Sequence, residues 1–227
     1  MFAIRWMGLG AGMLGAQDIQ WYAVPEGADC EILRGAQRWS LHEAWREGEA
    51  STGRTVAFAM NAGMFHPDGT PVGLHVHEGT TTAPLNQETD RPGNFFLQPN
   101  GVFGADTSGT WRVVTTIEAS GIAWVEATQS GPMLLIDGQL NPLFRAGSPN
   151  AYLRNGVGLA ADGTVWLACS RVPMNFHTFA EAMRARGCTD ALYLDGAISQ
   201  AWEDGESPAP PTTGSFGPVL LVFHPEH

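Results

Sequence analysis

Short apolar runs separated by turn residues recur along the chain and constrain its fold more than any other feature. They cover residues 55–60, 73–77, 94–97, 101–103, 111–115, 133–136, 156–160, 165–170, 191–194 and 218–223. Runs of this length bounded by Gly, Pro, Asn and Asp are typical of β-strands and are too short for most helices. The pair Asp162-Gly163, which lies between two such runs, predicts a hairpin turn.

Two segments have helical periodicity instead. Residues 40–47 form the amphipathic part of one predicted helix, and a second is predicted to end at Gly187. The second begins at either Asn175 or Thr178, because Thr178 and Glu181 match a capping box. The positions expected to be buried are Trp39, Leu41 and Trp45 in the first helix and Phe179, Ala180 and Met183 in the second. Many short strands with few helices predict an α+β fold, a single domain built on a mixed multi-stranded β-sheet.

Charge and composition exclude several classes of function. The chain has 227 residues with a net charge of −11, and every one of its 12 basic residues is arginine. The absence of lysine excludes Schiff-base chemistry and the lysine of a phosphate-binding loop. The acidic balance disfavours nucleic acid and anionic membranes as partners. No linker divides the chain, so residues 17–227 are expected to form one domain.

The first 16 residues indicate export. Residues 1–16 combine Arg5 with a short Gly- and Ala-rich run, which predicts a weak secretory signal or leader segment and a periplasmic or secreted protein. The alternative is an ordinary glycine-rich start of a cytoplasmic protein. No run is long enough to predict a transmembrane segment, which needs about 20 apolar residues. Cys30, Cys169 and Cys188 lack zinc-site spacing, so they are either core thiols or include one disulfide pair.

Two polar turns follow predicted strands in the first part of the chain. Asn61 and Gly63 come directly after the run that ends at residue 60 and could either bind a polar ligand or shape the turn. Gln129 and Ser130 precede Gly131-Pro132, ahead of another apolar run. Ser130 lacks the glycine two positions earlier that a nucleophile elbow requires. A polar turn that faces a ligand is therefore the better interpretation of this second motif.

Arg154-Asn155 and Asp195-Gly196 are the strongest candidates for chemistry. The planar guanidinium of Arg154 can bind two oxygens of a phosphate or carboxylate, although an isolated surface arginine would have the same sequence signature. Asp195 ends an apolar run, and Gly196 permits a tight turn that leaves the carboxylate facing a cleft. The same Asp could instead cap that turn.

Histidines offer an alternative site. His75 and His77 lie two apart on a predicted strand, and His66 is close in sequence, which together could form a metal cluster. A half-exposed strand face would also explain the pair. The sequence calls for no cofactor and leaves a divalent cation and the oligomeric state open.

Taken in order, these motifs resemble the phosphodiester glycosidase family, and the resemblance is closest to a bacterial, exported branch. The match runs from about residue 56 to residue 223. It rests on residues 61–65, 71–74, 94–96, 99–103, 129–132, 154–155 and 194–196. Ala62 and the Ala197-Ile198 pair stand where the family pattern has glycines, which narrows the space beside the expected site.

The resemblance implies a hydrolase that cleaves the glycosidic bond of a sugar-1-phosphodiester, with a small saccharide or glycoconjugate as substrate. Arg154 would clamp the phosphate and Asp195 would act at the anomeric centre, while the expected substrate-binding residues are Asn61, Gly63, Gln129, Ser130, Asn155 and Gly196. Asp68 and Glu181 are candidates for a second carboxylate. Two alternatives remain: a non-catalytic saccharide-binding module of the bacterial envelope, and a metal-dependent hydrolase that uses the histidine cluster.

Overall fold

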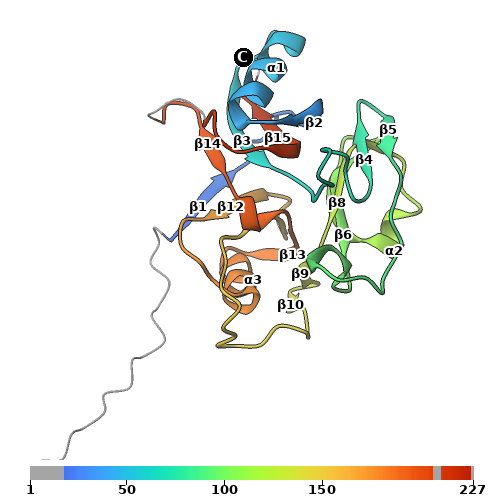
Figure 1. Cartoon of the computed structure of the whole chain (residues 1–227), viewed down its shortest axis with the longest axis vertical. Helices are drawn as coiled ribbons and strands as arrows, with labels where there is room; N and C mark the ends of the chain where they lie inside the picture. Colours follow the sequence, from blue (N-terminus) through green and yellow to red (C-terminus); the bar gives the residue numbers. More distant parts are fainter. Residues whose placement is uncertain (1–17, 207–210, 226–227) are drawn as a thin grey trace, which may run out of the picture.

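The computed structural model describes residues 18–206 and 211–225, in which the strands form three sheets (Figure 1). The six-stranded sheet has the order β1 (Ile19–Ala23), β12 (Val165–Ser170), β11 (Asn155–Ala160), β13 (Cys188–Tyr193), β9 (Met133–Ile136), β10 (Gln139–Leu140). The four-stranded sheet has the order β14 (Ala201–Glu203), β3 (Val56–Asn61), β15 (Phe216–Phe223), β2 (Cys30–Trp39). The five-stranded sheet has the order β5 (Thr80–Ala83), β4 (His75–His77), β8 (Trp124–Ser130), β6 (Gly101–Asp106), β7 (Trp111–Thr115).

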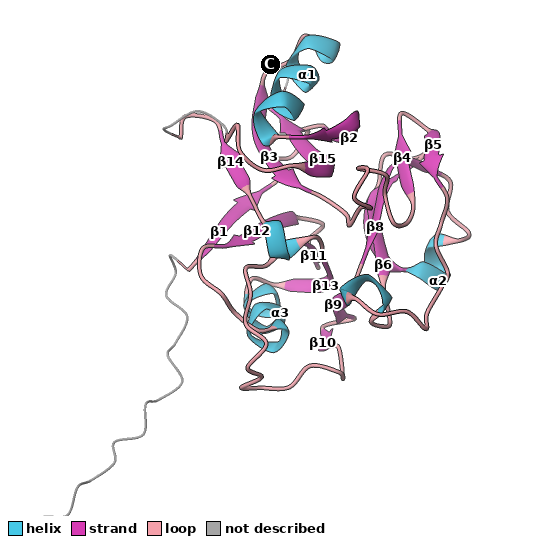
Figure 2. Ribbon diagram, in the orientation of Figure 1, coloured by secondary structure: helices cyan, strands magenta, loops and turns pink. Residues whose placement is uncertain are grey.

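Helices are few, as Figure 2 shows. They are α1 (Leu41–Thr52), α2 (Thr116–Ala119) and α3 (Phe176–Ala185), with short 3-10 turns η1 (Asn94–Phe96) and η2 (Gly196–Ile198). The predicted α+β class with few helices is confirmed. The predicted single mixed sheet is not what forms: the strands divide among three sheets, and each strand pairing in the described ranges is antiparallel. The predicted leader, residues 1–16, lies outside the described residues.

The first predicted helix forms for the expected reasons and is longer than expected. Ser40 caps α1 in a reciprocal box with Glu43, and Gly53 ends the helix in the left-handed conformation. Leu41 and Trp45 are buried against the four-stranded sheet, while Trp39 is half-buried at the end of β2. The helix therefore extends beyond residue 47 to Thr52.

The second predicted helix, α3, begins at the earlier of the two predicted starts. The side chain of Asn175 accepts a hydrogen bond from the Thr178 amide, so Asn175 is the cap and the Thr178–Glu181 box does not form. The expected core positions Phe179, Ala180 and Met183 are buried.

Two predictions about strands have clear outcomes. The hairpin at Asp162-Gly163 is confirmed, since it joins β11 to β12, which pair directly. The strand predicted for residues 94–97 is wrong, because this segment forms the 3-10 turn η1. Phe95 is buried in that turn, so the apolar residue that suggested a strand packs inward from a turn instead.

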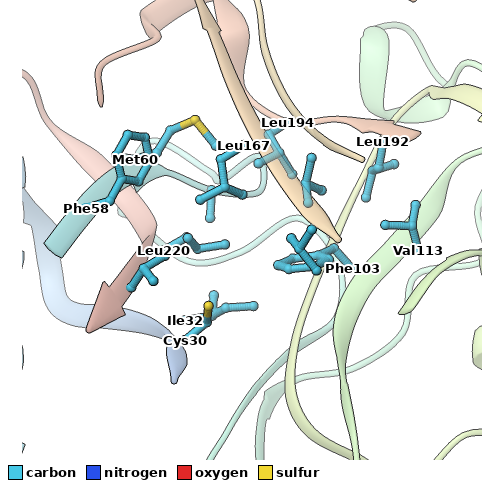
Figure 3. Packing of buried hydrophobic residues seen from close by; sticks show 14 of the residues in the cluster. Cys30, Ile32, Phe58, Met60, Phe103, Val113, Leu167, Leu192, Leu194 and Leu220 are labelled. Atoms are coloured by element: carbon cyan, nitrogen blue, oxygen red, sulfur yellow. The ribbon is translucent and has the colours of Figure 1, made fainter. Parts of the chain in front are cut away.

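One buried core joins the three sheets. Phe58, Met60 and Leu220 project from the four-stranded sheet, Phe103 and Val113 from the five-stranded sheet, and Leu167, Leu192 and Leu194 from the six-stranded sheet and its end (Figure 3). Because burial of apolar side chains is the main stabilising contribution in folding, the sheets depend on one another for stability.

In the described part of the chain, no helix is long and apolar enough to span a membrane.

The three cysteines are buried free thiols. Burial raises the pKa of Cys169 to about 12 and that of Cys188 to about 11, and it also raises the pKa of Cys30. Thiols with raised pKa values stay protonated and are poor nucleophiles. The structure therefore matches the alternative of reduced core cysteines.

A buried carboxylate connects two of the sheets. Glu126 on β8 accepts hydrogen bonds from the Ile32 amide on β2 (2.8 Å), the Glu78 amide (2.7 Å) and His77 Nδ1 on β4 (2.9 Å). Its side chain is 7% exposed. The hydrogen bond to Glu126 raises the pKa of His77.

We expect Glu126→Ala to lower the free energy of unfolding by about 3 kcal/mol at pH 6, because two amide donors and a charged imidazole lose their acceptor. The part that comes from His77 is fully present below the pKa of an unfolded histidine and is lost as pH rises through the raised folded value. Urea unfolding at pH 6 and pH 9 would measure both effects.

Glu88→Ala is the matched control, because Glu88 is exposed and pairs with the exposed Arg91. It should change stability by less than about 0.5 kcal/mol. Equal effects of the two substitutions would contradict the role given to Glu126.

Candidate active site

Arg154 lies immediately before β11 and is 2% exposed. Its amide donates to Ser170 Oγ (2.7 Å), which fixes the backbone to the neighbouring strand β12. Its guanidinium donates through Nε to the Met174 carbonyl (3.0 Å), through Nη2 to the Asn150 carbonyl (3.0 Å) and through Nη1 to the Tyr193 hydroxyl (3.4 Å). These bonds use three of the five N–H groups, which leaves one on each terminal nitrogen.

Aromatic rings, not carboxylates, surround the Arg154 charge. The arginine ion pairs of the described residues involve Arg54, Arg91, Arg112 and Arg184. The Arg154 guanidinium carbon instead lies 3.9 Å from the centre of the Phe176 ring and 5.3 Å from that of Tyr193. Cation–π contacts compensate only part of the cost of burying a charge, so an anionic ligand would complete this site.

Tyr193 connects Arg154 to the Asp195 turn. Its hydroxyl accepts from Arg154 Nη1 and from the Gly196 amide (3.0 Å). A side-chain carbon at Gly196 would lie 2.6 Å from that hydroxyl oxygen and 2.8 Å from the Arg154 Cα, so only glycine fits. Local motifs predict a role for Gly196 but none for Tyr193, which resembles one more apolar residue of its strand in the sequence.

Asp195 is held at its backbone and left free at its carboxylate. Its amide donates to the Ala62 carbonyl (3.2 Å), and its carbonyl accepts from Asn61 Nδ2 (2.7 Å). The carboxylate has no hydrogen-bond or ion-pair partner among the described residues, and burial raises its pKa to about 6. A carboxylate with such a pKa is suited to general base or nucleophilic chemistry near neutral pH.

Asn61 contacts Asp195 directly and Asn155 contacts Asn61, while Gly63 packs on the neighbouring strand β8. Asn61 Oδ1 accepts from the Gln200 amide (2.9 Å), so both ends of this amide are bonded to backbone groups, and it positions Asp195. Asn155 Nδ2 donates to the Asn61 carbonyl (2.7 Å), while its buried Oδ1 has no partner in the described structure. Gly63 packs so closely on β8 that a larger residue would meet Thr128 Oγ1. Direct substrate binding by these residues stays a prediction.

Gln129 and Ser130 lie at the end of β8, and their side chains are buried. The Gln129 amide accepts from the Leu74 and Asn86 amides (both 2.9 Å) and donates to the Asn86 carbonyl (2.7 Å) and to Thr116 Oγ1 (3.1 Å), so it fixes loops of the five-stranded sheet. Ser130 Oγ is buried with no partner in the described ranges. Neither residue lines the cavity at Arg154.

That cavity, here called the Arg154 cavity, has a volume of about 920 Å³. The connection between β10 and β11 forms one wall, and Phe176 and His177 of α3 form another. Its lining includes Arg145, Arg154 and His177, with no Asp or Glu among the lining residues described. In a chain of net charge −11, a cavity with this lining favours an anionic ligand.

Asp195 is not among the residues that line this cavity, although Tyr193 connects its turn to Arg154, and the remaining candidates lie apart from the cavity. Asp68 is exposed and accepts from the Thr70 amide and hydroxyl, while Glu181 pairs with Arg184 (2.6 Å). His75 and His77 line a different pocket from His66. Within the described ranges, no three His, Cys, Asp or Glu side chains are grouped so as to hold a metal ion.

Comparison with known proteins agrees with this geometry at the level of fold and family. The catalytic domain of zebrafish N-acetylglucosamine-1-phosphodiester alpha-N-acetylglucosaminidase, auto-inhibited by its pro-peptide, superposes with a TM-score of 0.63 at 14% identity, covering 91% of this chain and 83% of that chain. A hypothetical protein from Synechocystis superposes with a TM-score of 0.61 at 15% identity, covering 90% of this chain and 59% of that one. The fold is thus shared with a phosphodiester glycosidase.

The family assignment comes from the sequence match. The model of the phosphodiester glycosidase family matches residues 54–220, so this chain belongs to that family. The uncharacterized protein YigE of Escherichia coli K12 is 35% identical over 153 residues, which are 66% of this chain and 59% of that protein. The chain therefore matches less than two thirds of the length of this relative.

Proposed function

We propose that the protein hydrolyses the glycosidic bond of a sugar-1-phosphodiester, with Arg154 holding the phosphate and Asp195 acting at the anomeric carbon. The observation that carries this proposal is the buried Arg154 guanidinium, which opens on a cavity with cationic and no acidic lining among the described residues. Its two remaining N–H groups match the two free oxygens of a phosphodiester. Membership of the family supports glycosidase chemistry.

In the proposed reaction, the bond between the anomeric carbon and the bridging oxygen breaks, and its electron pair stays on that oxygen. The leaving group is a phosphate monoester, whose negative charge Arg154 stabilises. Water adds to the anomeric carbon and gives its proton to Asp195, or Asp195 first forms a covalent intermediate that water then opens. Because a phosphate leaves readily, the reaction needs little acid assistance. The engagement of Asp68 and Glu181 in other contacts fits this simple scheme.

The test is release of free sugar from a panel of sugar-1-phosphodiesters, including N-acetylglucosamine-1-phosphodiesters and nucleotide sugars. Release by the wild type would support the proposal. Absence of release, with binding of the same compounds still measurable by calorimetry, would favour a saccharide-binding module. Unchanged release after dialysis against a chelator would argue against the histidine-based hydrolase.

The pH dependence of kcat/KM is expected to follow Asp195. Burial raises the pKa of this carboxylate to about 6, and both proposed roles need the ionised form. Activity should therefore rise about tenfold per pH unit below pH 6 and level off above it. A rate that instead falls as pH rises through 6 would mean that Asp195 acts as a proton donor.

We also propose that the protein acts in the periplasm or outside the cell, on the basis of residues 1–16. Cell fractionation with N-terminal sequencing of the mature protein would test this. Recovery of the intact N-terminus in the cytoplasm would contradict it.

A further inference from the structure

Exposed apolar side chains gather at the mouth of the Arg154 cavity. The large hydrophobic residues exposed among those described are Leu97, Ile117, Val125, Leu143, Tyr152, Val172 and Ile198. Three of them line this cavity: Leu97 (38% exposed), Leu143 (56%) and Tyr152 (57%). Such a concentration at one concave site is a feature of ligand-binding surfaces, whereas single exposed apolar residues need no explanation.

Aromatic rings continue this apolar surface down to the buried charge. Phe144 lies beside Leu143 in the wall and stacks on Phe176, with ring centres 5.1 Å apart. The Phe176 ring in turn lies 3.9 Å from the Arg154 guanidinium carbon. Aromatic and aliphatic side chains thus adjoin the buried charge along one part of the lining, which elsewhere includes polar side chains such as Arg145 and His177.

We propose that the substrate is amphiphilic: a sugar-1-phosphodiester whose aglycone is an alkyl chain. This inference rests on the proposed function for the position of the phosphate at Arg154. The chain would leave the phosphate along Phe144 and Phe176 and reach Leu97 and Leu143 at the mouth. Leu97 and Leu143 are aliphatic, so they favour a hydrocarbon chain over a hydroxylated aglycone, which would leave them in contact with polar groups.

The test uses two sugar-free phosphodiesters of equal charge, diethyl phosphate and ethyl octyl phosphate, titrated by calorimetry into the full chain below the micelle concentration. We expect the octyl diester to bind at least about tenfold more tightly, because burial of its additional CH2 groups is favourable. Equal affinities, or no measurable binding of either diester, would overturn the inference.

The double variant Leu97→Ser/Leu143→Ser tests whether these two side chains cause the preference for the octyl diester. It should reduce the octyl preference to about twofold while leaving diethyl phosphate affinity unchanged. Ile117→Ser is the matched control, because Ile117 is 86% exposed and lies outside the cavity, and it should keep the full preference. A preference that survives in the double variant would overturn the inference. If the double variant does not fold, Leu143→Ser alone provides the same comparison.

Turnover separates this inference from the proposed function. Hydrolysis of octyl and methyl glycosyl phosphates with equal kcat/KM would contradict the alkyl aglycone and leave the glycosidase proposal standing. A tenfold binding preference for the octyl diester without hydrolysis of either glycosyl phosphate would contradict the glycosidase proposal alone.

Discussion

Asp195→Asn is expected to lower kcat on a sugar-1-phosphodiester by about 1,000-fold, while the dissociation constant of diethyl phosphate stays within about threefold of the wild-type value. The reason is that an amide can neither accept a proton from water nor form a stable bond to the anomeric carbon. The backbone contacts of Asp195 with Ala62 and Asn61 do not involve its side chain, so the turn should keep its shape. Single-turnover kinetics together with calorimetry would measure both quantities.

The same substitution should stabilise the protein. Burial raises the pKa of Asp195 from its ordinary 3.8 to about 6, so the folded state binds this proton more tightly than the unfolded state. Stability therefore falls as pH rises from about 4 to 6 and stays lower above 6. Removing the ionisable group should recover up to about 3 kcal/mol at pH 8. Loss of activity with a raised melting temperature is the expected signature of a residue kept for chemistry.

Asp190→Asn is the control for this experiment. Asp190 lies on the strand that leads to Asp195, and its carboxylate accepts from the Asp137 amide and from the Thr189 hydroxyl. Activity should change by less than about twofold. If Asp190→Asn reduces kcat as much as Asp195→Asn does, or if Asp195→Asn keeps full activity, Asp195 is not the catalytic carboxylate.

Sequence patterns predict those parts of the fold that depend on local features. The capped helix at Ser40 and the hairpin at Asp162-Gly163 are set by residues a few positions apart, and both form as expected. Strand β8 was missed because it carries the buried polar residues Glu126 and Gln129, which look like surface positions. Several of their hydrogen-bond partners are distant in the chain: Ile32 lies 94 positions from Glu126, and Asn86 lies 43 positions from Gln129.

Strands β1 and β2 were missed for a related reason. The sequence of β2 has Arg34, Gly35 and Gln37 in its middle, which interrupt the alternation of apolar and polar residues. Its pairing with β15 comes from the far end of the chain. This segment forms a strand because it pairs with a distant part of the chain, and the local sequence pattern does not predict that pairing.

For the candidate site, the sequence identifies residues but not their partners. Arg154, Asp195 and Gly196 were all named from local motifs, and the structure joins Arg154 to Gly196 through the hydroxyl of Tyr193. Tyr193 could have been suspected only from its position two residues before Asp195 in the same apolar run. The Arg154 cavity itself depends on the irregular connection before β11, for which periodicity predicts nothing.

Arg154→Met is expected to weaken binding of diethyl phosphate by about 100-fold or more and to lower kcat on sugar-1-phosphodiesters by about 100- to 1,000-fold. Methionine fills a similar volume and keeps contact with Phe176, while it removes the buried charge and all five donors. Binding of the neutral methyl glycoside of the preferred sugar should change by less than about threefold. Calorimetry with both ligands, beside steady-state kinetics, would make this comparison.

Two further variants decide whether Arg154 acts as a geometric clamp or only as a positive charge. Arg154→Lys retains the charge but loses the Nε bond to the Met174 carbonyl and the paired donors, so it should recover less than about a tenth of the lost affinity. Arg145→Met removes an exposed charge from the same cavity and should weaken diethyl phosphate binding by less than about fivefold.

Equal losses of diethyl phosphate affinity in Arg145→Met and Arg154→Met would mean that the overall positive potential of the cavity binds the phosphate. Equal losses for the neutral glycoside and the phosphodiester in Arg154→Met would mean that Arg154 supports the fold of the cavity instead, because a clamp for an anion has no effect on a ligand without charge.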